Sequence, residues 1–198
     1  MAEMKGGLPI LAFASQAAWE EWLAAQPPTA RGLWLKLAKK DSGVATVSQT
    51  EAIAGALCHG WIDGQVGKLD ETCWLIRFTP RRPQSKWSAI NRDRALHLIA
   101  SGRMQPAGLR EVERARADGR WAVAYASQRT ATAPDDLAAA LAANPTAQEL
   151  FDALDSTNRY AIIYRVGDAK KPETRARRIE QYVAMLARGE TIYPRKGQ

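Results

Sequence analysis

The chain is poor in the residues that carry most metal and redox chemistry. Among its 198 residues there are only two Cys, Cys58 and Cys73, and two His, His59 and His97. The His residues are 38 positions apart, and neither they nor the Cys pair follow a metal-binding spacing. No apolar run approaches the ~20 residues needed to span a bilayer. We therefore expect no metal centre, no cofactor and no membrane span.

A short apolar run, residues 8–14, stands near the amino terminus. It is at the lower limit of a signal-peptide core, contains Pro9 and leads directly into a helical pattern. We interpret it as part of the folded protein and predict a cytoplasmic location. Cys58 and Cys73 are then expected to be reduced, although a hairpin between them would also allow a disulfide.

Acidic residues are outnumbered, since 28 Lys and Arg stand against 21 Asp and Glu and give a net charge of +7. Of the basic residues 19 are Arg, whose planar fork matches carboxylate and phosphate groups. The excess favours acidic partners. A high share of Arg and Ala also fits a GC-rich genome and a solvated surface, so composition alone leaves both interpretations open.

Hydrophobic periodicity predicts an α+β fold that is mainly helical. Alternation predicts a small antiparallel three-stranded sheet, with strands at residues 31–40, 61–67 and 72–79. Helices at residues 15–25 and 48–60 should pack on this sheet, the second opened by a capping box of Ser48 and Glu51.

The chain divides into two domains in this interpretation. Residues 1–125 form the α+β domain, which ends with two helices between residues 88 and 119. Residues 126–134 are small, polar and unpatterned, which is typical of a linker. Residues 135–198 form a C-terminal helical bundle of four helices.

The densest group of polar and aromatic residues lies between residues 57 and 87. Arg77 and Thr79 share one face of a predicted strand, and a proline-bounded basic loop follows. Arg beside Trp binds phosphate, carboxylate or a nucleic-acid backbone. We predict a ligand-binding surface formed by Trp61, Asp63, Arg77, Thr79, Arg81, Arg82, Trp87 and Asn91. A structural alternative stays open, because Asp63 and Arg77 could form a cross-strand ion pair.

No residue is predicted to be catalytic. Cys58, His59 and Asp63 have the types of a nucleophilic site, but adjacent residues on a helix point about 100° apart. His59 is more simply explained by the negative end of a helix dipole. A helix-turn-helix at residues 88–118 is a weak alternative, because its second helix carries acidic residues.

Four segments of the chain resemble the bacteriocin-protection family, also called the YdeI or OmpD-associated family. They are GLWLKLAKKDSG (32–43), ALCHGWIDGQVGKLDETCWLIRFTPRRPQSKWSAINRDR (56–94), SGRMQPAGLREVERARADGRW (101–121) and AKKPETRARRIEQYVAMLARG (169–189), which together cover nearly the whole chain. The resemblance implies a helical OmdA-type module from about Pro134. Its name implies protection against bacteriocins and cationic antimicrobial peptides, and association with an outer-membrane porin.

Three functions are compatible with these observations. The first is a non-enzymatic stress or bacteriocin-protection protein that acts through the basic-aromatic surface. The second is a binder of nucleic acid or of a phosphorylated small ligand, in which Arg77, Arg81, Arg82 and Trp87 meet the anion. The third is an uncharacterised enzyme acting on an anionic substrate.

Overall fold

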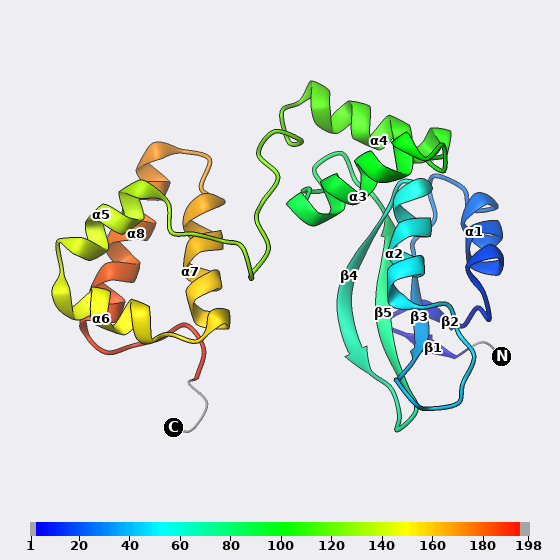
Figure 1. Ribbon diagram of the computed structural model, residues 1–198, viewed down its shortest axis with the longest axis horizontal. Helices are drawn as coiled ribbons and strands as arrows, with labels where there is room; N and C mark the ends of the chain where they lie inside the picture. Colours follow the sequence, from blue (N-terminus) through cyan, green and yellow to red (C-terminus); the bar gives the residue numbers. More distant parts are fainter. Residues whose placement is uncertain (1–2, 195–198) are drawn as a thin grey trace. The chain divides into compact units, whose positions relative to one another are not determined.

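The computed structural model describes residues 3–194 of the chain. In this part the chain forms eight α-helices and one five-stranded sheet, so the fold is α+β (Figure 1). Two compact units are present, Met1–Ala124 and Tyr125–Gln198. The first contains the sheet and helices α1 to α4, and the second contains helices α5 to α8.

The sheet has the strand order β1-β2-β3-β5-β4. Its strands are β1 (Met4–Lys5), β2 (Leu8–Leu11), β3 (Leu33–Ala38), β4 (Trp61–Lys68) and β5 (Cys73–Pro80). The three predicted strands are present as β3, β4 and β5, and β5 pairs antiparallel with both of the others. The prediction of a purely antiparallel three-stranded sheet is wrong, because β1 and β2 extend it and β2 runs parallel to β3. That parallel pair is joined through a helix, a long-range arrangement that alternation within one strand does not reveal.

Four helices complete the first unit, and serine side chains cap the first turns of three of them. They are α1 (Gln16–Ala24), α2 (Gln49–Cys58), α3 (Ala89–Ala100) and α4 (Pro106–Ala117). The capping box of α2 is confirmed, since Ser48 Oγ accepts from Glu51 N and Glu51 Oε2 accepts from Ser48 N. Gly60, just after α2, has a positive φ of 76°, a conformation that glycine adopts without steric cost.

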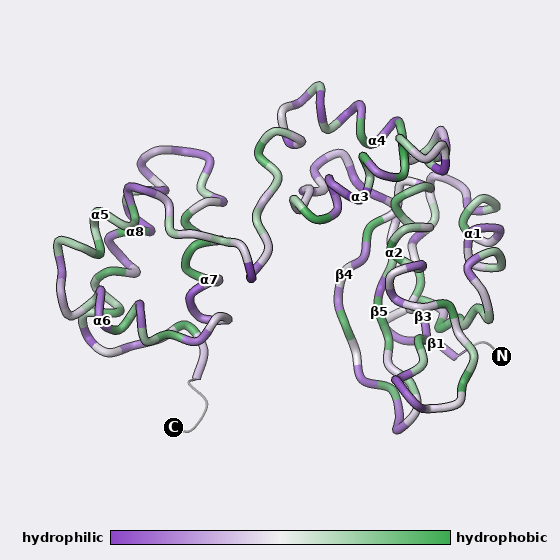
Figure 2. Tube along the Cα trace, in the orientation of Figure 1, coloured by the Kyte–Doolittle hydropathy of each residue, from purple (hydrophilic) through white to green (hydrophobic). Residues whose placement is uncertain are grey.

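The main core lies between one face of the sheet and helices α1 and α2, which run side by side in Figure 1. Trp19 of α1 is completely buried, contacts Phe78 of β5 at a ring-centroid distance of 5.4 Å, and donates from Nε1 to Ala52 O of α2 at 3.0 Å. Hydrophobic residues run along most of α2 (Figure 2), which explains why α2 is covered on several sides. One tryptophan therefore joins two helices and the sheet.

The second unit is a helical cluster with a core of its own. Its helices are α5 (Asp135–Ala142), α6 (Pro145–Ala153), α7 (Ser156–Gly167) and α8 (Pro172–Ala187). Leu137, Ile162 and Leu186 are completely buried among them. Asn144 caps α6, since its side chain accepts from Ala147 N, and Asp155 caps α7, since its carboxylate accepts from Asn158 N at 2.7 Å. Within residues 3–194 no helix is both long and apolar enough to cross a bilayer.

Candidate functional site

The eight residues of the predicted binding surface do not lie together. Directly paired residues of neighbouring strands point to the same side of a sheet. Asp63 pairs with Phe78, whose ring faces the helices, whereas Arg77 pairs with Trp34 on the opposite side. The sheet therefore separates the two charges, and the alternative of an Asp63–Arg77 cross-strand pair is wrong.

On the helix-covered face the predicted residues serve packing and tethering. Trp61 is 4% exposed and contacts Trp22 edge to face at a centroid distance of 5.6 Å. Asp63 Oδ1 accepts a hydrogen bond from Asn91 Nδ2 at 3.3 Å, and Asn91 Oδ1 accepts from Arg94. This chain of polar groups ties the first turn of α3 to β4.

The basic loop after β5 is built around a stack of cations and indoles. The guanidinium carbon of Arg81 lies 3.6 Å from the ring centroid of Trp87, and Arg81 Nη1 donates to Lys86 O. Trp87 in turn contacts Trp121 edge to face at 4.9 Å. Arg81 and Trp87 are 7% and 2% exposed, so they hold the loop in place. Of the predicted loop residues, Arg82 remains exposed.

The opposite face of the sheet presents a different group of residues, which we call the strand-only face: Leu8, Ile10, Trp34, Lys36, Leu75, Arg77 and Thr79, with Lys5 above them. Its apolar cluster consists of Leu8, Trp34 and Leu75, with Ile10 and Leu69 packed against it. No helix residue of the described part belongs to this cluster. The predicted residues Arg77 and Thr79 share this face, as their alternation indicated.

Trp34 is the centre of the strand-only face. Its indole Nε1 donates to Lys5 O at 3.1 Å, and Lys5 Nζ lies 4.8 Å from the ring centroid. Lys5 Nζ also lies over Gly67 of β4, at 2.7 Å from the position that a Cβ would occupy there. The glycine thus leaves the space in which the ammonium group rests on the indole.

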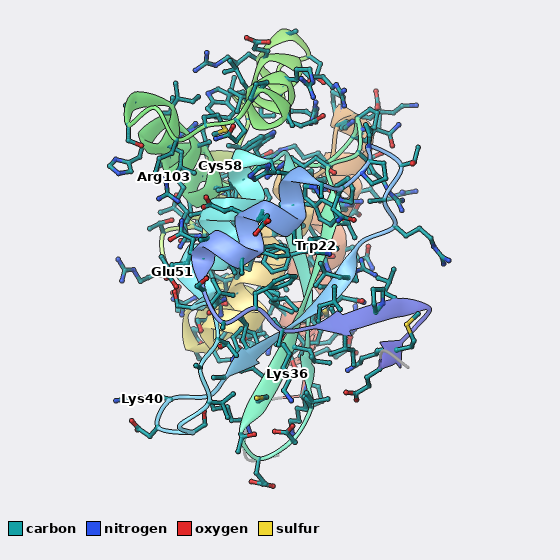
Figure 3. All side chains as sticks on the ribbon, turned by 90° about the vertical axis from the view of Figure 1, so that its right-hand side faces the viewer. Trp22, Lys36, Lys40, Glu51, Cys58 and Arg103 are labelled. Atoms are coloured by element: carbon teal, nitrogen blue, oxygen red, sulfur yellow. The ribbon has the colours of Figure 1, made fainter. Side chains whose placement is uncertain are left out.

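Arg77 and Lys36 flank Trp34. Arg77 lies beside Trp34 across the β3–β5 ladder, and its guanidinium extends over Gly64 of β4. Its Nε is buried and has no hydrogen-bond partner among the described residues. Lys36 Nζ is 3.9 Å from Asp70 Oδ2, and both side chains are partly exposed, so this ion pair is weak. Figure 3 shows Lys36 on the sheet and Lys40 away from it in the β3–α2 loop.

Cys58 and His59 show no sign of activation. Burial raises the pKa of the Cys58 thiol to about 11, and burial also lowers the pKa of His59. A reactive thiol requires the opposite shift. Cys58 and Cys73 are both free and buried. Cys73 begins β5, whereas Cys58 ends α2 close to Trp61, which pairs with Pro80 at the other end of β5. The length of β5 therefore separates the two cysteines by roughly 20 Å, which excludes a disulfide. Residues 3–194 contain no group of three or more His, Cys, Asp or Glu that could hold a metal ion.

Sequence reasoning missed Lys5, Trp34 and Lys36 as candidate site residues. Trp34 and Lys36 alternate with three buried leucines of β3, so their shared face was visible in the sequence. The pairing of Trp34 with Arg77 was not visible, because β5 lies about 40 residues further along the chain.

Two protein-family models match the chain, and the gap between the two matches contains the boundary between the two compact units. Residues 11–111, just over half of the chain, match a family described as Domain of unknown function (DUF8412). The chain belongs to this DUF8412 family. Residues 130–189 match a second model, OmdA, described as Bacteriocin-protection, YdeI or OmpD-Associated. The expected OmdA module is thus confirmed, whereas the first half of the chain has a family model of its own. No curated protein and no solved structure matches the chain.

Proposed function

We propose that the DUF8412 part of the chain is a non-enzymatic binding module that holds a phosphate-bearing ligand on the strand-only face. The proposal rests on the environment of the Arg77 side chain. A guanidinium on a sheet face with its Nε buried and unpaired is costly unless a counter-charge approaches it. A bound phosphate would supply that charge.

The charges around Arg77 support an anionic ligand. Residues 1–124 contain 17 Lys and Arg and 12 Asp and Glu, so this unit carries five of the seven excess positive charges. Lys36 and Arg77 are diagonal neighbours across two paired strands, about 7–8 Å apart at their Cα atoms. Their long side chains can converge on one phosphate group or reach two adjacent ones.

The burial of Trp34 limits the ways in which such a ligand could be recognised. Trp34 is only 7% exposed and the Lys5 ammonium group lies over its ring, so it does not offer a free surface on which a base could stack. Recognition therefore rests on the phosphate charge. Both a phosphorylated small molecule and a nucleic-acid backbone provide it.

The test is a titration of the full-length protein with a fluorescein-labelled 20-residue oligothymidylate, with pyrophosphate as competitor. Arg77→Gln and Lys36→Gln should each weaken binding about tenfold, the loss of one charge-assisted contact. Each should also lower the slope of log K against log salt by about 0.7. Lys40→Gln removes the same charge from the loop beside the sheet and should change affinity less than twofold (Figure 3).

The outcomes separate the two ligand sources. If pyrophosphate competes at micromolar concentration, the ligand is a small phosphorylated compound; if only the oligonucleotide binds, it is a nucleic acid. Equal effects of Lys40→Gln and Arg77→Gln would reduce the binding to general charge attraction. Failure of both probes to bind would refute the proposal.

The OmdA match favours a second candidate function for the whole chain, a non-enzymatic role in bacteriocin protection. The net charge of +7 argues against direct capture of cationic peptides, so protection would act through a bound partner. A strain that lacks the gene should survive bacteriocin exposure less well than its parent and recover when the gene is restored. Equal survival of parent and mutant would refute this role.

A further inference from the structure

The second unit contains a groove on its surface, beside its own core. The groove has a volume of about 580 Å³ and lies along α8 and the side of α5. The lining residues of α8 recur at helical spacing from Pro172 to Ala184, which is one continuous stripe about 18 Å long. Such a length matches about twelve residues of a second helix.

The floor of the groove is apolar and shallow. Ile179 is 8% exposed and Val183 is partly buried, so both belong to the core and to the groove. Ala140, Ala176 and Ala184 have small side chains, which lets another backbone approach closely. A helix packed here would bury its own apolar stripe between α5 and α8.

The charges along the groove differ in how firmly they are held. Arg175 donates from Nε and Nη2 to the two carboxylate oxygens of Asp136, at 2.5 and 2.7 Å, and from Nη1 to Val166 O. Arg175 and Asp136 therefore neutralise each other at one end of the groove. Glu180 lies on the rim, is exposed, and has no ion-pair partner among the described residues.

We propose that the groove binds an amphipathic α-helix of a partner protein, whose apolar stripe lies against Ile179 and Val183 and whose Lys or Arg meets Glu180. The charge balance of the groove is negative, because Asp136 and Arg175 cancel and Glu180 remains. A Lys or Arg beside the apolar stripe of the partner would complement Glu180. The small alanine side chains that line the groove allow the backbone of a helix to approach closely. The proposal does not depend on the phosphate site of the first unit.

The test uses two fluorescein-labelled helical peptides of 15 residues with the same Leu and Ala stripe, one with Lys and one with Glu beside the centre of that stripe. The full-length protein should bind the Lys peptide more tightly. Glu180→Lys should weaken the Lys peptide about fivefold and make the Glu peptide the tighter ligand, as expected for an exposed ion pair that is reversed. Ala176→Trp should fill the groove and abolish binding of both peptides.

Glu173→Lys is the matched control, since Glu173 is exposed on α8 but does not line the groove. It should leave both affinities within twofold of the wild type, and circular dichroism should show that all variants keep their helices. Equal effects of Glu173→Lys and Glu180→Lys would overturn the proposal. So would failure of both peptides to bind, or binding that survives Ala176→Trp.

Discussion

Gly108 provides a sharp test of how α2 and α4 pack, because the sign of its substitution depends on the structure. Alanine in place of glycine within a helix normally stabilises a protein by about 0.5–1 kcal/mol. A Cβ at position 108 would lie 2.4 Å from Cys58 O, 2.5 Å from Leu57 O and 2.5 Å from Met104 Sδ. Two of these atoms are backbone carbonyls at the end of α2, so α4 would have to move away.

The expected result is a net loss of stability. Overpacking costs about 1–3 kcal/mol, which exceeds the gain in helix propensity, so Gly108→Ala should lower the free energy of unfolding by about 1–2 kcal/mol. All seven Trp lie in residues 1–124, so Trp fluorescence during guanidinium unfolding follows the first unit alone. Gly167→Ala is the control, because nothing lies within 4 Å of a Cβ at that position in α7.

Gly167→Ala should stabilise the second unit by up to about 1 kcal/mol, as followed by far-UV circular dichroism. A Gly108→Ala variant as stable as the wild type would show that the close approach of α4 to the end of α2 is wrong.

Four further outcomes follow from the structure. Cys58 and Cys73 should stay unlabelled by a thiol reagent at pH 8 in the folded protein and react after denaturation, because both are buried and the pKa of Cys58 is raised to about 11. Rapid labelling of the folded protein would contradict this. The lowered pKa of His59 means that the unfolded state takes up the proton first as the pH falls, so stability should fall as the pH drops below about 6.5, and less so in His59→Asn. Equal pH dependence in the two proteins would contradict the partial burial of His59. Trp19→Ala should cost about 3–5 kcal/mol, because it empties the centre of the first core. Asp136→Asn should cost less than about 1 kcal/mol despite its two short hydrogen bonds, because the pair is partly exposed.

Local features of the fold could be predicted from sequence because their causes are local. The capping box at Ser48, the alternation of β3 and β5, and the four C-terminal helices all rest on residues within one or two turns of each other. Strand β2 could not, since Pro9 and the following helical pattern concealed a four-residue strand whose partner lies beyond α1.

The candidate site depended on pairing between segments that are distant in the sequence. The sequence places Asp63 and Arg77 on facing strands, but a shift in the β4–β5 register between Asp63 and Val66, and the pairing of Asp63 with Phe78, decide which face each occupies. The cation–indole stack of Arg81 and Trp87 likewise depends on Trp121, which follows α4. Composition therefore pointed to basic and aromatic residues as candidates, and the pairing of distant strands placed the proposed site around Trp34.

The most direct test of the strand-only face uses the seven tryptophan indole N–H signals in a two-dimensional ¹⁵N NMR spectrum of the full-length protein. Trp34→Phe assigns the signal of Trp34, and pyrophosphate or oligothymidylate is then added to the wild type. Binding on the strand-only face should move the Trp34 signal with saturation, while the signals of Trp61 and Trp87 stay in place. A shift of the Trp61 or Trp87 signal without any change at Trp34 would contradict it.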